Sequence, residues 1–371
     1  MWHHRRMIVE RQVELHFAPE SREAETHTNL SAVRQDGRCL WVAGDETATI
    51  ERLTATTDSR GRVTGYGGQR TVRLGDLIPL PAGPEEEADI EGLARADGWL
   101  WAVGSHSLKR KKIKPGHSAA KSRKRLATVV REDNRFILAR LPLVTGDDGL
   151  PEVTGEDGER TAAVLGGHHD SLTDLLAGDP HLAPFLSIPS KDNGIDVEGI
   201  AAHGERLYIG LRGPVLRGWA VLIEIHPETD PGDPRRLRPR PIGADGEPYR
   251  THFLDLGGLG VRDLCPHGDD LLVLTGPSMD LDGPVRVVRW PGAAAGDGAG
   301  VVPAEDLRVL GELPHGEGDD HAEGIAVLEE TGEDGGPRLL VVYDSPAPGR
   351  LTADHGVLAD VVAFGREDPP K

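Results

Sequence analysis

The amino-acid sequence predicts an all-β fold, a single β-propeller of repeated four-stranded blades. Two observations support this prediction: a short motif that recurs along the chain, and a constant order of apolar runs and tight turns after each copy. Three copies are nearly identical: DIEGLA at 89–94, DVEGIA at 196–201 and HAEGIA at 321–326. Two weaker copies begin at Asn29 and Gly260.

Each copy of the motif is followed by the same succession of signals. A dipeptide such as Asp36-Gly37 or Asp97-Gly98 comes next and favours a hairpin, because glycine accepts a positive φ angle. Two further apolar runs follow, and a less regular fourth strand precedes the next copy. The copies begin near positions 29, 89, 196, 260 and 321, so their spacings are 60, 107, 64 and 61 residues. Antiparallel units at this period are typical of propeller blades with long loops.

The number of copies predicts five blades. The last unit lacks a fourth strand before the chain ends, whereas residues 8–17 have the pattern of a strand and precede the first copy. We predict that this N-terminal strand completes the last blade and closes the ring, which removes exposed sheet edges. Six blades are the alternative, because the spacing of 107 residues has room for another unit.

We interpret the long spacing as insertions instead. Residues 108–134 are expected to form a basic loop, because the run from Leu108 to Arg125 is strongly basic and unfavourable for a strand. Residues 171–186 predict one short helix, in which Leu172 and its neighbours have helical spacing and Ser171 can cap the first turn.

Composition narrows the class of protein. The 371 residues carry a formal net charge of −19, which argues against general binding to nucleic acids or anionic membranes. The two cysteines, Cys39 and Cys265, lie in unrelated repeats and are expected to be reduced. The start of the chain does not resemble a secretory signal, and no apolar run reaches the ~18 residues of a membrane span. We therefore expect one cytoplasmic domain over 8–365, with flexible tails at 1–7 and 366–371.

Three glutamates occupy the same position of the motif: Glu91, Glu198 and Glu323. Ser31 and Arg262 stand there in the weaker copies. If first strands line a central channel, these side chains meet at one mouth, where carboxylates repel unless a cation or protons offset them. Oxygen ligands suit Ca²⁺ or Mg²⁺, so the three glutamates are candidate metal ligands. The alternatives are that each glutamate accepts backbone N–H bonds between blades, or that Arg262 alone pairs with them.

Further candidates lie on the same face. Asp196 precedes Glu198 by two residues and His321 precedes Glu323 by two, so each pair shares a strand face and is a candidate acid–base pair. His106, in the loop after a second strand, is a third candidate for acid–base chemistry. A hydrogen-bonded structural role is the alternative for a lone histidine in such a loop.

Basic residues surround the same predicted opening. The candidates for substrate binding are Lys109, Arg110, Lys191, Arg212, Arg217 and Arg262. Because guanidinium groups bind carboxylate or phosphate in a bidentate manner, they predict an anionic small-molecule ligand. The alternative is that Arg212 and Arg217 pair internally with Glu198 and its neighbours. The basic run 109–125 lacks interleaved aromatic residues, so a nucleic-acid partner is not expected.

The longer strings around these motifs resemble a known family. DIEGLA with LWAVGSHSLKRKK, PSKDNGIDVEGIA with GLRGPVLRGWAVLIEI, and HAEGIAVL are similar to the bacterial domain of unknown function 3616, over residues 20–365. This resemblance implies a propeller-like fold and no established activity. More distantly, the motif is similar to phytase-like esterase and SdiA-regulated propellers, where calcium-dependent phosphoester hydrolysis is one theme. That similarity carries over only onto Glu91, Glu198 and Glu323.

Two functional hypotheses follow from the sequence. The first is a hydrolase in which a metal held by the three glutamates acts on a phosphorylated or acidic small molecule. The second is a propeller that binds a ligand or a protein without catalysis and needs no metal.

Overall fold

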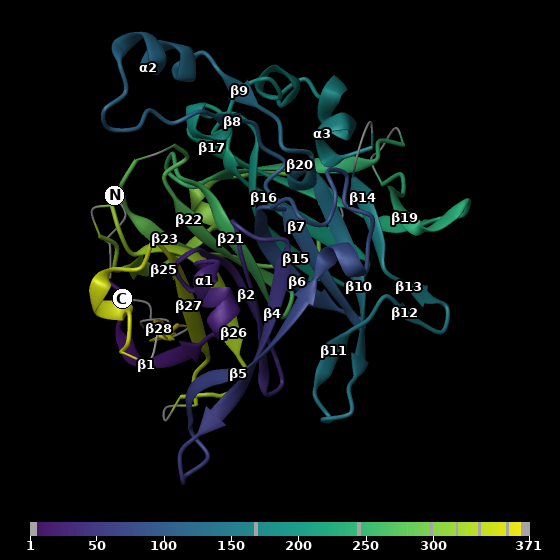
Figure 1. Ribbon diagram of the computed structural model, residues 1–371. Helices are drawn as coiled ribbons and strands as arrows, with labels where there is room; N and C mark the ends of the chain where they lie inside the picture. Colours follow the sequence, from purple (N-terminus) through teal and green to yellow (C-terminus); the bar gives the residue numbers. More distant parts are fainter. Residues whose placement is uncertain are drawn as a thin grey trace.

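The computed structural model describes residues 6–166, 170–242, 246–279, 281–296, 300–316, 318–332, 335–353 and 356–364, and strands dominate it (Figure 1). The expected tails at 1–7 and 366–371 lie outside the described residues except for Arg6 and Met7. Those two residues are not a free tail, because Met7 is 7% exposed and donates its N–H to the carbonyl of Glu312 at 2.9 Å. Among the described residues, no helix has both the length and the apolar character required to cross a membrane.

The five copies of the motif form five first strands, which we call the inner strands. They are β2 (Leu30–Asp36), β6 (Ile90–Ala96), β15 (Asp196–His203), β21 (Gly260–His267) and β26 (His321–Leu328). Each inner strand pairs antiparallel with the second strand of its unit through a tight turn. The second strands are β3 (Cys39–Gly44), β7 (Trp99–Gly104), β16 (Arg206–Gly213), β22 (Asp270–Gly276) and β27 (Arg338–Asp344).

Two more antiparallel strands extend each unit outward. The third strands are β4 (Thr49–Thr57), β10 (Ile137–Thr145), β17 (Trp219–Ile225), β23 (Val285–Trp290) and β28 (Gly356–Ala363). The fourth strands are β5 (Val63–Arg73), β14 (Ala163–Gly166), β20 (Tyr249–Asp255), β25 (Arg308–Leu313) and, for the last unit, β1 (Val9–His16). The architecture is therefore a propeller-like all-β fold.

The N-terminal strand joins the two ends of the chain. β1 pairs antiparallel with β28, with Val13 opposite Ala359, and pairs briefly in parallel with β5. This is the partner expected for residues 8–17. As a result, the first and last units share one eight-stranded sheet.

The inner strands contact one another in a closed circuit: β2 with β6, β6 with β15, β15 with β21, β21 with β26, and β26 with β2. Glycine makes this close approach possible. A Cβ on Gly199 would lie 2.9 Å from the Cα of Asp263 in the next inner strand, a distance that real Cβ atoms do not show. Apolar side chains fill the space between consecutive four-stranded units, including the space between the last unit and the first.

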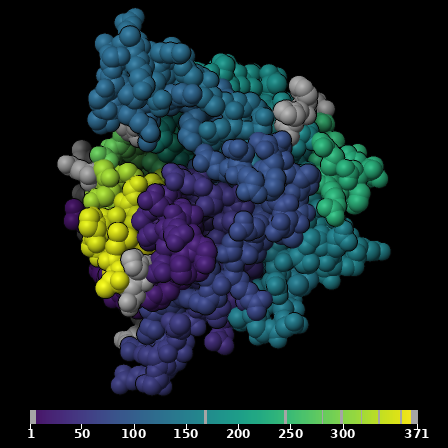
Figure 2. Space-filling view, viewed as in Figure 1, coloured from purple at the N-terminus to yellow at the C-terminus, as the bar shows by residue number. Residues whose placement is uncertain are grey.

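The long spacing holds insertions, but the basic one is not a plain loop. Residues 108–134 contain β8 (Lys109–Arg110) paired with β9 (Val129–Val130), and between them α2 (Ala119–Leu126). The expectation of a strand-free basic loop was therefore wrong. Ser118 caps α2 by accepting the N–H of Lys121, and the segment projects as a lobe from one end of the molecule (Figures 1 and 2).

The second insertion contains the expected helix in shorter form. α3 (Leu172–Leu175) begins with a capping box between Ser171 and Asp174, and two 3₁₀ turns continue it to Phe185. The prediction of a single helix was wrong, because α2 and the five-residue α1 (Pro19–Glu23) are also present. α1 is too short and too polar to show a helical apolar period.

Further strands, most of them short, lie outside the four-stranded units. They are β11 (Pro151–Val153), β12 (Glu156–Asp157), β13 (Arg160–Thr161), β18 (Pro227–Asp230), β19 (Asp233–Pro239) and β24 (Val301–Val302). Two of them, β18 and β19, extend the second sheet beyond β14. None of these strands joins the circuit of inner strands.

Candidate functional site

A β-bulge recurs at the same place in all five inner strands. The register with the second strand skips one residue between Leu30 and Ala32, and it does so at the equivalent point of each other unit. The skipped residues are Ser31, Glu91, Glu198, Arg262 and Glu323. A bulge re-aims the side chain of the extra residue and is frequent beside functional sites. The five motif positions are therefore structurally equivalent as well as similar in sequence.

These residues and their charged neighbours form what we call the mouth cluster. Its members are Ser31, Asp45, Asp89, Glu91, Asp196, Glu198, Arg212, Arg262, Glu323 and Asp344. They come from the starts of the inner strands and from the ends of the second strands, which lie at the same end of each hairpin. Carboxyl groups outnumber arginines in this cluster.

Arginines neutralise one side of the cluster, which we call the paired arc (Glu198, Arg212, Arg262 and Glu323). Arg262 Nη1 lies 3.4 Å from Glu198 Oε2 and also contacts Glu323 Oε1. Arg212 Nη1 lies 2.7 Å from Glu198 Oε1, and its Nε donates to Asp196 Oδ2 at 2.8 Å. Both arginines are 8% exposed, so these are buried charge pairs. Arg212 thus has the internal partners that the sequence analysis offered as the alternative to anion binding.

The other side, the open arc (Ser31, Asp45 and Glu91), has no arginine. The side chain of Glu91 makes no hydrogen bond or ion pair with any residue that the structure describes. Ser31 Oγ and Asp45 Oδ1 are buried without a hydrogen-bond partner in that same part of the chain. Buried polar atoms are normally paired, so these groups need an explanation.

Burial and mutual repulsion shift the ionisation of these carboxyl groups. Burial, with Asp89, Glu198, Asp45 and Glu323 nearby, raises the pKa of Glu91 well above its usual value. Burial and surrounding carboxylates, Asp89 first, raise the pKa of Asp45 to about 8. Burial also raises the pKa of Glu198 to about 8 even though Arg212 and Arg262 oppose the shift. Asp45 is therefore largely protonated near neutral pH, and the pKa of Glu91 is shifted in the same direction.

Asp89 differs from the carboxyl groups of the open arc because Arg135 contacts it. Arg135 is the last residue of a 3₁₀ turn (Asp133–Arg135) at the end of the basic insertion, and its Nη2 also lies 3.0 Å from Glu87. Burial outweighs the opposing effects of Arg135 and Ser105, so the pKa of Asp89 rises only to about 6. Asp89 also has a left-handed backbone with φ of 52°, a conformation that is costly for a residue with a side chain.

The two candidate histidines lie in different environments. His106 is 1% exposed, its Nδ1 contacts the Gly104 carbonyl at 2.8 Å, and burial lowers its pKa to about 4. It is thus a neutral buried ring that packs edge-on against Phe136. His321 Nδ1 lies 3.8 Å from Asp344 Oδ2 and its Nε2 lies 3.5 Å from Asp282 Oδ1, and the neighbouring Asp344 carboxylate raises the pKa of His321. Of the two, only His321 borders the mouth cluster with a partly exposed side chain.

The remaining basic candidates do not join the cluster. Lys109 pairs with Glu87 at 3.0 Å and Glu132 at 3.3 Å, and Arg110 pairs with Asp192. Lys191 is exposed and has an interaction partner. Arg217 is exposed, with a positive φ of 50°, and makes no ion pair with a residue of the described ranges.

A buried ion pair lies further along the inner strands. Arg34 of β2 donates to both carboxylate oxygens of Asp263 in β21, at 2.8 and 3.0 Å. The same guanidinium reaches the carbonyls of Ile200 at 2.9 Å and Ile325 at 2.8 Å. Four inner strands are thus tied together at the centre of the circuit.

The three glutamates do not fit a divalent metal. Arginines already occupy carboxylate oxygens of Glu198 and Glu323, which leaves only Glu91 unpaired. Over the described residues, no group of three or more His, Cys, Asp and Glu side chains is arranged to hold a metal ion. The arginines supply the positive charge that the sequence analysis assigned to Ca²⁺ or Mg²⁺.

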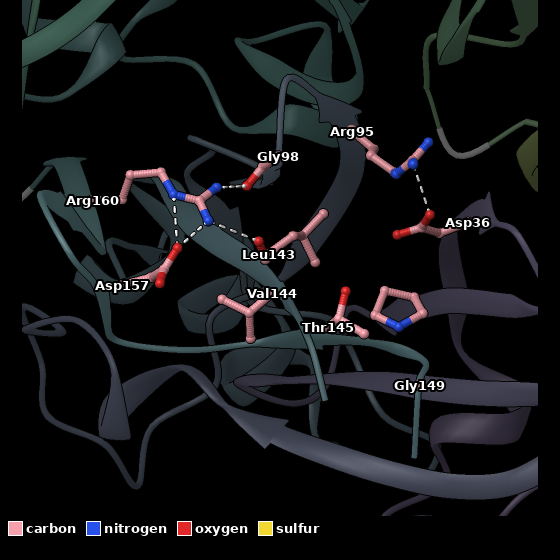
Figure 3. Close-up of a pocket in the computed structure, with 10 residues that line it drawn as sticks. Asp36, Arg95, Gly98, Leu143, Val144, Thr145, Gly149, Asp157 and Arg160 are labelled. Carbon is pink, nitrogen blue, oxygen red and sulfur yellow. Dashed lines mark hydrogen bonds and ion pairs between the residues drawn. The ribbon is translucent and has the colours of Figure 1, made fainter. Parts of the chain in front are cut away.

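A separate cavity of about 560 Å³ lies at the opposite end of the hairpins, beside the turn at Gly98 (Figure 3). Its charged residues are paired with each other: Arg95 with Asp36 at 2.8 Å, and Arg160 with Asp157. Because its charges are satisfied internally, this cavity does not compete with the mouth cluster as the candidate site.

Several members of the site escaped the sequence analysis. Asp45 directly follows a second strand and Asp344 is the last residue of another, and this shared position at the end of the strand was a usable signal. Arg135 had no such signal, because its contact with Asp89 depends on how the insertion folds. The pair of Arg34 and Asp263 was equally hidden, since nothing in either motif copy relates the two residues.

Comparison with known proteins gives a family and no activity. No curated protein is matched by the sequence. Among solved structures, the glutaminyl cyclase of Myxococcus xanthus is 9% identical, with a TM-score of 0.40 and coverage of 97% of each chain. The endosialidase of phage phi92 is 9% identical, with a TM-score of 0.39 and coverage of 96% of this chain and 69% of that one. Likenesses at these levels carry no functional argument.

The family comparison covers most of the chain. Residues 29–360 match the family described as protein of unknown function DUF3616. That range includes all five inner strands and the whole mouth cluster, and the chain belongs to this family.

Proposed function

We propose that the mouth cluster is the acid–base site of a hydrolase that acts on a small polar molecule without a metal. The observation that carries this proposal is the presence in one cluster of two carboxyl groups whose pKa values are both raised but whose surroundings differ. Burial and neighbouring carboxylates raise the pKa of Glu91 well above its usual value, whereas Arg135 opposes the rise at Asp89, whose pKa is about 6. Pairs of carboxyl groups whose environments separate their pKa values commonly divide the roles of acid and base.

In this proposal Glu91 donates a proton to the leaving group, and Asp89 accepts a proton from the attacking water. His321, whose pKa is raised by Asp344, is the second group able to donate. In the paired arc, Arg212 and Arg262 hold Glu198 and Glu323 in place, and their positive charges reduce the negative charge around the substrate. We also infer that the five four-stranded units form one closed five-bladed ring, which the contacts of β26 with β2 support.

The test is turnover with matched variants. Purified protein is assayed with 4-nitrophenyl acetate, 4-nitrophenyl phosphate and 4-nitrophenyl glycosides, each with and without EDTA. We expect hydrolysis of at least one of these substrates, unchanged by EDTA, and a loss of about 100-fold or more in Glu91→Gln. Glu305→Gln, an exposed position outside the cluster, is the control and should keep full activity. Undiminished activity in Glu91→Gln, or activity that EDTA removes, would overturn the proposal.

A second candidate is a binding protein without catalysis. The burial of His106 favours it, because the mouth then has fewer groups for proton transfer. The anionic ligand predicted from the sequence belongs to this candidate as well, with exposed Arg217 as the cation available to it. Absence of turnover on all three substrate types, together with ligand binding, would favour this candidate.

A further inference from the structure

Several hydrogen-bond acceptors at the mouth lack a donor. Ser31 Oγ, Asp45 Oδ1 and Glu198 Oε2 are buried without a hydrogen-bond partner among the described residues. Ser31 is 2% exposed and Glu198 is 4% exposed, so bulk water does not satisfy them. Ser31 and Glu198 occupy bulge positions, and Glu91 stands at the bulge of the inner strand between theirs.

The donors nearby are already used. Arg212 forms ion pairs with Asp196 and Glu198. Arg262 forms an ion pair with Glu323 and donates a hydrogen bond to the carbonyl of Pro277. Its contact with Glu198 Oε2, at 3.4 Å, is an ion pair without hydrogen-bond geometry. Within the described ranges, no lysine or arginine makes an ion pair with Asp45 or Glu91.

We propose that the open arc, together with Glu198 Oε2, binds the ammonium group of a small amine. This inference rests on the proposed function and names its substrate class: a small molecule that carries a primary or secondary amine. Such a group offers donors and no acceptor, and its positive charge offsets the surplus of carboxylates.

Other ligand classes fit this arc less well. An anion would be repelled by the carboxyl groups of Glu91 and Asp45 before it reached an unpaired cation. A guanidinium group is planar and suits two oxygens of one carboxylate, whereas the unpaired acceptors here belong to separate side chains. An ammonium group spreads its donors tetrahedrally and can reach acceptors on several side chains at once. Protonation offsets part of the negative charge of the arc, since the pKa of Asp45 is about 8, so binding of a cation displaces a proton.

The experiment measures binding without turnover. Thermal unfolding and calorimetric titration at about pH 8 are recorded with butylammonium chloride, with 1-butanol as the uncharged control and sodium chloride as the ionic-strength control. Separate titrations use sodium phosphate and calcium chloride. We expect saturable binding and stabilisation with butylammonium alone. Stabilisation by butanol to the same degree, or by phosphate or calcium instead of the amine, would overturn the inference.

Variants locate the bound group. Glu91→Gln should weaken butylammonium binding about tenfold or more, because a hydrogen bond to a charged group is lost. Ser31→Ala should weaken it about threefold, and Glu305→Gln should leave it unchanged. Glu91→Lys places an ammonium group within the arc itself and should abolish amine binding. Tight binding that survives both Glu91→Gln and Ser31→Ala would place the amine elsewhere and refute the proposal.

Different results would refute the hydrolase proposal and the amine-binding proposal. If amines bind but none of the chromogenic substrates is hydrolysed, the hydrolase proposal is lost and the amine site stands. If Glu91-dependent hydrolysis occurs while amines neither bind nor compete, the amine inference alone is refuted.

Discussion

The paired arc and the open arc use equivalent backbone positions for opposite purposes. Glu198, Arg262 and Glu323 follow one another around the circuit, and the arginine lies between two glutamates and contacts both. Ser31 and Glu91 stand on the neighbouring bulges without such a cation. One residue type at one motif position is therefore structural in one arc and available for ligands in the other. The identity of the neighbour at the next bulge decides which role a glutamate has.

The largest effect is expected from removing the central cation of the paired arc. Arg262→Met should destabilise the protein by about 3–5 kcal/mol, because Glu198 and Glu323 lose a buried partner. Urea unfolding at neutral pH measures this change. Arg217→Met, at an exposed arginine, is the control and should shift stability by less than about 0.5 kcal/mol. If Arg262→Met were as stable as this control, the arc would not depend on its arginine.

Replacing the carboxyl group of Glu91 in the open arc should change stability in the opposite direction. Glu91→Gln should unfold at the same or a slightly higher urea concentration, because a buried carboxyl group without a partner is replaced by a neutral amide. The expected gain is between about 0 and 1 kcal/mol. A loss of more than about 2 kcal/mol would show that Glu91 has a structural partner and that the two arcs do not differ.

The contrast also predicts how stability depends on pH. The folded-state pKa of Glu198 is about 8, above its usual 4.5, so its favourable contribution is complete below pH 4.5 and is lost as pH rises through 8. Asp45, Glu91 and His321 shift in the same direction. The pKa of His106 is lowered, so its contribution to stability changes with pH in the opposite direction, but only below its usual pKa of 6.5.

The free energy of unfolding should therefore fall between about pH 6.5 and pH 8.5, and urea titrations across this window measure the fall. Glu91→Gln should flatten the slope, because one of the titrating groups is gone. A stability that rises with pH over this window would contradict the assigned directions.

The smallest effect is expected at Ser31. Ser31→Ala removes a buried hydroxyl that has no partner, so stability should change by less than about 1 kcal/mol. A larger loss in thermal unfolding would mean that the hydroxyl is bonded within the folded protein and is not waiting for a ligand.

The sequence predicted the repeat and the position of the site better than the chemistry of the site. Periodic apolar runs are local, so the inner strands and the partner of β1 followed from pattern. The equivalence of Glu91 and Glu198 followed from the motif, and β-bulges at both positions agree with it. The pairing of Glu198 with arginines could not be predicted from the motif, because it depends on the directions of side chains that come from different sheets. The same reason hid Arg34 and Asp263.

The position of β1 bears on how the chain is made. Val13 lies at the start of the chain and Ala359 near its end, yet the two are paired in one sheet. During synthesis β1 is made before the other strands and has no antiparallel partner until β28 has also been made. Such distant contacts form slowly, because a long loop must close before the pairing contributes stability. The last unit is thus completed only after all the other strands have been made.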